Sequence, residues 1–257
     1  MANNVLFYIW QGMRESLIAE HRFYIDQARS RLLSQFDNIS DEADQAANEY
    51  WEKRGETFNP DFDDPCSIAE AAYQTGGEYY CLLTEMHEST RLSVVAGMYH
   101  QWDKKLREWL VRESQKFGGR AAVAEAFWRK PFKDMIDLLD RLGWDVSGKP
   151  YFNSLKACDL VVNVYKHGEG RSFNELKQEF PQFLPDLLGE HSFDRDRADN
   201  SWIDHTHLRV SDAQLQSFSD AIVEFWRNIP EYTLDSEDLS APSWLTRAIQ
   251  TDAEANI

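Results

Sequence analysis

The feature that most restricts the fold of this chain is a long stretch without proline, from Ser67 to Phe117. Proline ends or kinks a helix, so a stretch of this length without it is free to form one continuous helix. Its apolar residues recur at steps of three and four, the spacing of one helix face: Val95, Met98, Trp102, Leu106 and Trp109. We therefore predict a long helix with one buried stripe, interrupted early at Gly76–Gly77 if at all, and ended at Gly118–Gly119.

Similar spacing continues along most of the chain and predicts an all-α fold, a bundle of long antiparallel helices with little or no β structure. Ser40 and Ser211 are predicted helix N-caps. Further helices are predicted at 13–36, 40–54, 120–130, 131–142, 151–167, 172–179 and 212–228. We predict a single helical domain over 1–257, with its core at about 13–229 and an acidic C-terminal tail over 231–257.

Composition limits the class of protein. Hydrophobic residues make up 42% of the 257 residues, enough for a sizeable core. No apolar run approaches the length of a membrane span, and the first residues lack the basic and apolar regions of a signal peptide. The three cysteines are too far apart for a disulfide framework or a metal motif. We therefore expect a cytoplasmic protein with no membrane partner, no metal and no cofactor.

The charge is unevenly distributed. The net charge of −17 argues against a general nucleic-acid binder, because an acidic surface repels a polyanion. Residues 101–177 nevertheless hold 15 Lys and Arg against 11 Asp and Glu, a net charge of +4, whereas the rest of the chain carries −21. The basic middle segment is either an ordinary solvated helix surface or the part of the chain that meets an anionic partner.

The segment 155–172 carries the most informative motif. On a helix its polar residues share one side, at the helix end: Asp159, Asn163, Lys166 and His167. A helix C-terminus favours the protonated form of a nearby histidine, so His167 is a candidate acid–base group. Lys166 and Arg171 are placed to hold an anion such as a phosphate. The alternative is that Lys166, His167 and Gly168 only cap the helix for stability.

The pattern Asn-x-x-Lys-His-Gly at 163–168 resembles the motif region of HEPN-type domains. These are bacterial and archaeal helical domains, many of them metal-independent endoribonucleases of toxin–antitoxin, phage-defence and CRISPR systems. Their signature is an arginine, often followed by a polar residue, and then a histidine. Asn163 matches the polar residue and His167 the histidine. The arginine position falls on Val162, so Lys166 or Arg171 would have to contact the phosphate instead.

The resemblance implies an RNA-directed protein and, if the site is active, a ribonuclease effector in a defence or toxin–antitoxin system. His167, Asn163 and Lys166 would be catalytic, and Arg171, Lys156 and Ser172 would bind the substrate. The chemistry would be attack of a ribose 2′-hydroxyl on the adjacent phosphate, with no metal. Because the family pairs two motif helices in one composite site, a homodimer is expected.

Three alternatives stay open. With no arginine at Val162, the domain could bind RNA or protein without cutting. The acidic remainder, with Trp244 in its C-terminal tail, fits a non-catalytic interaction or regulatory subunit that binds a protein partner. His205 and His207 could form half of a metal site with Asp204 or His191, although other ligands at a recognisable spacing are missing.

Overall fold

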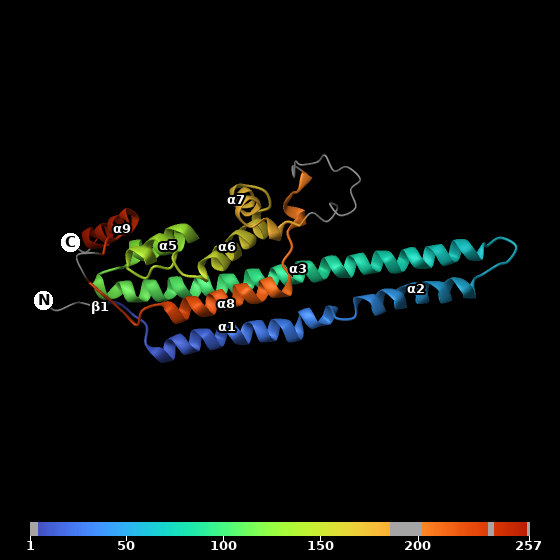
Figure 1. The fold of residues 1–257 in the computed structure, drawn as a ribbon, viewed down its shortest axis with the longest axis horizontal. Helices are drawn as coiled ribbons and strands as arrows, with labels where there is room; N and C mark the ends of the chain where they lie inside the picture. Colours follow the sequence, from blue (N-terminus) through green and yellow to red (C-terminus); the bar gives the residue numbers. More distant parts are fainter. Residues whose placement is uncertain (1–4, 186–201, 236–238, 256–257) are drawn as a thin grey trace. The chain divides into compact units, whose positions relative to one another are not determined.

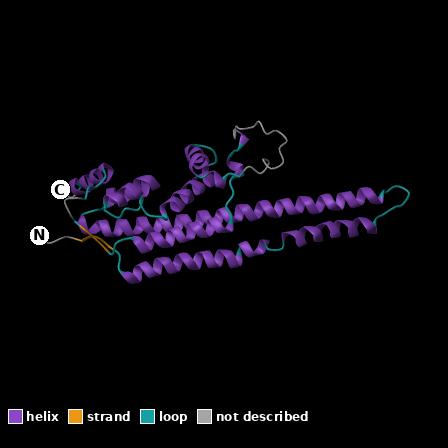
Figure 2. Ribbon diagram, in the orientation of Figure 1, coloured by secondary structure: helices purple, strands orange, loops and turns teal. Residues whose placement is uncertain are grey.

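The computed structural model describes residues 5–185, 202–235 and 239–255 (Figure 1). Within these ranges the chain is helical apart from short loops and one two-stranded antiparallel sheet (Figure 2). The prediction of an all-α fold with little β structure is confirmed. Among the described helices, none combines the length and the apolar composition that crossing a lipid bilayer requires.

The regular elements follow the predicted order. In the first half they are β1 (Val5–Tyr8), α1 (Gln11–Arg31), the 3-10 turn η1 (Leu33–Phe36), α2 (Ile39–Glu56) and α3 (Pro65–Ser114). In the second half they are α4 (Ala121–Arg129), α5 (Phe132–Arg141), α6 (Phe152–His167), α7 (Arg171–Glu179), η5 (His205–His207), α8 (Asp212–Asn228), β2 (Tyr232–Leu234) and α9 (Ser243–Glu254).

The chain divides into two compact units. Unit 1 comprises Met1–Ile25 and Val95–Ile257, and unit 2 comprises Asp26–Val94. Both α1 and α3 contribute residues to each unit. Because the division runs through two continuous helices, the prediction of one helical domain over 1–257 stays a prediction.

The core of unit 1 is built on the predicted apolar stripe of α3. All five of its residues, from Val95 to Trp109, are buried, with at most 3% of any side chain exposed. The ring of Trp102 meets Phe225 of α8 edge-on, at 5.1 Å between ring centres. Such aromatic pairs add to the free energy gained by burying apolar area. The predicted stripe is therefore confirmed as core.

Helix α4 is capped at both ends by charged side chains from other helices of unit 1. At its start, the carboxylate of Asp252 in α9 accepts backbone N–H bonds at 2.6, 2.9 and 3.0 Å, from Arg120, Ala122 and Val123. At its end, the buried guanidinium of Arg107 in α3 donates to the carbonyl oxygens of Phe127 and Lys130. A negative charge at a helix start and a positive charge at its end both complement the helix dipole.

The short sheet pairs the beginning of unit 1 with its later part. The register is Val5 with Leu234, Phe7 with Thr233 and Tyr8 with Tyr232, with an irregularity between Val5 and Phe7. Buried Thr233 also accepts a hydrogen bond from the indole of Trp144, at 2.8 Å. The predicted C-terminal tail is thus tied to the body of unit 1 through β2 and, by Asp252, through α9.

The two predicted N-caps have different outcomes. Ser211 caps α8 as predicted, in a reciprocal box with Gln214. Ser40 does not cap α2, because the helix already begins at Ile39, with Asn38 in the cap position and no side-chain cap. The 3-10 turn η1 ends only two residues before α2 and brings the chain into the helix early.

In unit 2, α2 and the first part of α3 run antiparallel to each other (Figure 1). They approach closely at Gly76, where an added Cβ would lie 3.0 Å from the carbonyl oxygen of Ala43 and from the Cβ of Ala47. Gly76 and Gly77 therefore do not interrupt α3. This close approach favours glycine at Gly76, because a Cβ there would require Ala43 and Ala47 to shift by a few tenths of an ångström.

Candidate functional site

The predicted motif lies at the end of α6. The helix stops at Gly168, whose φ of 70° is a left-handed value that favours glycine. Lys166 and His167, in the last turn, are both exposed. Val162, at the arginine position of the HEPN pattern, is buried with 2% exposed, so its side chain belongs to the core.

Asn163 is engaged within its own helix. Its amide nitrogen donates to the backbone oxygen of Asp159 at 2.9 Å and to the Asp159 carboxylate at 3.0 Å. The hydroxyl of Tyr99, from α3, donates to the same carboxylate at 2.6 Å. Burial raises the pKa of Asp159 to about 6, although both hydrogen bonds favour the charged form. Asn163 therefore belongs to a partly buried polar cluster that joins α3 and α6.

The predicted substrate-binding residues divide into two groups. The ammonium of Lys156 lies 3.1 Å from Glu175 and 2.7 Å from Glu179, so it joins α6 to α7. Arg171 is exposed and Ser172 half-buried, both in the first turn of α7. The residue at the N-cap position of α7 is Gly170, which has no side chain with which to cap the helix. Arg171 therefore remains close to the motif helix, whereas Lys156 acts as a structural link.

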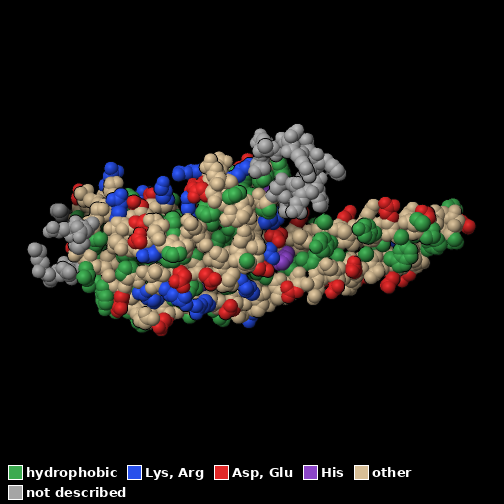
Figure 3. All heavy atoms as spheres, in the orientation of Figure 1, with side chains coloured by type: hydrophobic (Ala, Val, Ile, Leu, Met, Phe, Trp, Pro, Cys, Tyr) green, Lys and Arg blue, Asp and Glu red, His purple; other side chains and the backbone are tan. Residues whose placement is uncertain are grey.

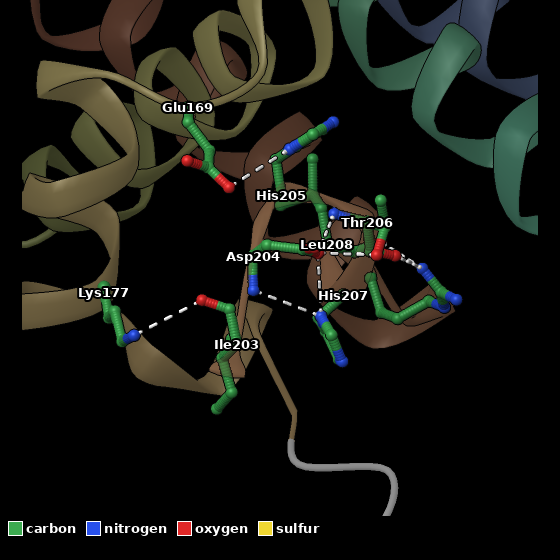
Figure 4. Close-up of polar contacts among 9 residues, drawn as sticks. Glu169, Lys177, Ile203, Asp204, His205, Thr206, His207 and Leu208 are labelled. Atoms are coloured by element: carbon green, nitrogen blue, oxygen red, sulfur yellow. Dashed lines mark hydrogen bonds and ion pairs between the residues drawn. The ribbon is translucent and has the colours of Figure 1, made fainter. Parts of the chain in front are cut away.

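The structure brings a second histidine to the end of α6. A Cβ on Gly168, the residue directly after His167, would lie 3.5 Å from the ring of His205. On its other side, Nδ1 of His205 lies 3.8 Å from the carboxylate of Glu169 (Figure 4). We name the exposed residues gathered here the α6–α7 turn cluster: Lys166, His167, Glu169, Arg171 and His205.

Two hydrogen bonds and a cap hold His205 in this position. The carboxylate of Asp204 accepts from the backbone N–H of Thr206 and so caps η5, which fixes the turn that carries His205. The hydrogen bond between the Asp204 carboxylate and the side chain of Thr206 lowers the pKa of Asp204 to about 2. Lys177 of α7 donates to the carbonyl oxygen of Ile203 at 3.3 Å, which links η5 to α7 (Figure 4).

The two histidines of the His205–His207 pair take different partners. His207 turns toward Asp204, with 3.0 Å between Nδ1 and the carboxylate, and packs edge-on against Trp202. Over the described ranges no three His, Cys, Asp or Glu side chains are grouped so that they could hold a metal ion. His191, the fourth residue of the metal hypothesis, lies outside those ranges.

No protein-family model, curated protein or solved structure matches this chain. The resemblance to HEPN domains therefore still depends on the residues at 163–168, and the chemistry of the site has to be argued from its own geometry.

The sequence did not predict that His205 lies against Gly168, at the end of α6. The segment between them has no clear periodicity, so nothing in the spacing places η5 beside α6. The only signal was the His-Thr-His pattern itself, which was interpreted as half of a metal site.

Proposed function

We propose that this chain is a HEPN-like, RNA-directed protein that cleaves RNA without a metal ion, at the α6–α7 turn cluster. The observation that supports the proposal is the position of the His205 ring against Gly168, the residue that follows His167 in the chain. Two imidazoles with cationic neighbours provide the acid, the base and the phosphate contacts that such a cleavage needs.

The reaction requires two proton transfers. One imidazole removes the proton from a ribose 2′-hydroxyl, whose oxygen then bonds to the adjacent phosphorus. As the bond from phosphorus to the 5′-oxygen breaks, a second imidazole gives that oxygen a proton. The products are a 2′,3′-cyclic phosphate and a 5′-hydroxyl, so atoms and protons balance.

The surroundings of the two rings suggest their roles. Glu169 faces Nδ1 of His205, which leaves Nε2 to act as the base. His167, the last residue of α6, is the remaining imidazole of the cluster and is assigned as the acid. Lys166, Arg171 and the backbone N–H groups at the start of α7 would hold the phosphate.

Asn163 has a positioning role in this proposal. Its hydrogen bonds to Asp159 lie within the turn of α6 that directly precedes Lys166 and His167. A bacterial effector of defence or toxin–antitoxin type, working as a homodimer in the cytoplasm, is the setting that the HEPN resemblance suggests.

The test is cleavage of labelled RNA by the purified protein in the presence of EDTA. We expect 2′,3′-cyclic phosphate ends, and a rate lowered about 100-fold or more in His167→Ala and in His205→Ala, because positioned acids and bases contribute roughly 10²–10⁴-fold. His100→Ala, which removes an exposed histidine of α3, is the matched control. Failure to cleave any RNA, or equal cleavage by all three variants, would refute the proposal.

A further inference from the structure

The hydrophobic core of unit 2 is small. Only seven of its apolar side chains are buried, and three of these are alanines: Ala28, Ala43 and Ala72. Short helices gain most of their stability from packing against other elements, and small side chains bury little area. A hairpin with so small a core has apolar surface left over.

The apolar surface of unit 2 that is not buried belongs to large, exposed side chains. Nine of the sixteen exposed large apolar residues of the described chain belong to unit 2, and the most open are Phe62, Tyr73, Leu82 and Met86. Figure 3 shows hydrophobic and acidic side chains together over this hairpin. Aromatic side chains bury roughly 150–250 Å² each, so a partner covering several of them would approach the roughly 800 Å² per side of a stable complex.

One stripe of α3 has the form of a helix-docking site. Residues at steps of three and four share a helix face, and this one carries Glu70, Tyr73, Gly77, Tyr80 and Thr84. Tyr73 is 83% exposed and Tyr80 46% exposed. Between them, a Cβ added at Gly77 would meet nothing within 4 Å. We name this row the tyrosine stripe; it has two rings with an open notch between them.

The net charge of unit 2 indicates what kind of partner would bind the tyrosine stripe. It holds 15 Asp and Glu against 5 Lys and Arg, a net charge of −10. Of the five cations, Arg54 pairs with Asp63 and Arg91 with Glu88. Two copies of this surface would repel each other, whereas a cationic partner would be attracted.

We propose that the tyrosine stripe of unit 2 docks a basic amphipathic helix of a partner protein. An apolar side chain of that helix would enter the notch at Gly77, between the two tyrosine rings, as a knob enters a hole between helices. Lysines and arginines on its flanks would face the acidic residues of the hairpin. This binding is independent of RNA cleavage, because its residues all lie in unit 2 and the α6–α7 turn cluster lies in unit 1.

The test uses the full chain and two helical peptides with the same leucine stripe, one flanked by lysines and the other by glutamates. Fluorescence anisotropy should show binding of the lysine peptide that weakens as salt is added, and no binding of the glutamate peptide. A Cβ at Gly77 meets nothing within 4 Å, so Gly77→Leu places its side chain in the notch. We expect this variant, like Tyr80→Ser, to weaken binding about tenfold or more.

Ser89→Leu is the control, since it adds the same side chain at an exposed position on the opposite side of α3. It should leave peptide affinity unchanged, and RNA cleavage should be unaffected in all three variants. Three results would overturn the proposal: no binding of the lysine peptide, equal binding of both peptides, or unchanged affinity in Gly77→Leu. Self-association that Gly77→Leu abolishes would show that the occupant is a second copy and would also overturn it.

Discussion

His21 of α1 is buried against α8, with its Nε2 atom 2.9 Å from the hydroxyl of Ser219. Burial lowers the pKa of His21 from 6.5 to about 4, because the charged ring would lose its hydration. The unfolded chain therefore takes up a proton before the folded chain does. The stability contributed by neutral His21 is present above about pH 6.5 and is lost as the pH falls toward 4.

We expect this loss to reach about 3 kcal/mol, since one pKa unit corresponds to about 1.4 kcal/mol. His21→Gln keeps a polar side chain opposite Ser219 but cannot titrate. Urea unfolding at pH 7.5 and pH 4.5 should show a larger loss of stability in the wild type than in this variant. Equal losses in the two proteins would mean that His21 does not control the acid sensitivity.

Asp159 illustrates what could be predicted at this scale and what could not. The spacing of 159, 163, 166 and 167 places these residues on one side of α6, and the hydrogen bonds of Asn163 to Asp159 confirm that arrangement for the first pair. The bond from Tyr99 could not be predicted, because it comes from a helix 60 positions away. The proximity of His205 to Gly168 could not be predicted either, because these two residues are also far apart in the sequence.

Among the elements, α3 was predicted most closely, because a long apolar period without proline identifies a helix and its buried face together. The caps of α4 were not predictable, since Arg107 and Asp252 lie in other helices and neither has the sequence spacing of a local cap. The strands β1 and β2 were also missed, because each is only a few residues long and pairs across most of the chain.

The adjacent glycines of α3 give a matched test of the hairpin in unit 2. Alanine is favoured over glycine in a helix by about 1 kcal/mol, and the new methyl group at Gly77 would meet nothing within 4 Å. At Gly76 the methyl group would press on Ala43 and Ala47 of α2, at 3.0 Å. We therefore expect Gly77→Ala to stabilise the protein and Gly76→Ala to destabilise it.

Thermal unfolding of the two variants measures this difference directly. The effect of helix propensity is the same at both positions, so any difference in stability reports the contact between α2 and α3. If Gly76→Ala were as stable as Gly77→Ala, the two helices would not pack as closely as the structure places them.

At the scale of the whole molecule, the sequence predicted the fold class but not the division into two units. The predicted apolar stripe of α3 begins at Val95, directly after the boundary, but the spacing of its residues does not indicate that a separate unit ends there. The charge difference between the acidic hairpin and the basic segment 101–177 was visible in the sequence as composition. Whether this charge difference affects binding depends on which charged side chains are exposed, and composition does not reveal that.

The homodimer that the HEPN resemblance suggests makes a prediction about assembly. Two chains of 30.0 kDa should give a particle of about 60 kDa in light scattering at micromolar concentration, because cyclic pairs are the commonest protein assemblies. The tyrosine stripe should not form this interface, since unit 2 carries a net charge of −10. Gly77→Leu should therefore leave the mass unchanged. A mass near 30 kDa would contradict the homodimer.

The capping of α4 by Asp252 also affects how this chain folds during synthesis. The N–H group of Arg120 and its carboxylate acceptor are 132 positions apart. At roughly 5–20 residues per second, a ribosome would need about 7 to 26 seconds to make the chain between them. During that interval the first N–H groups of the nascent α4 lack their carboxylate cap. The start of α4 is therefore a point where chaperones or proteases could bind the growing polypeptide.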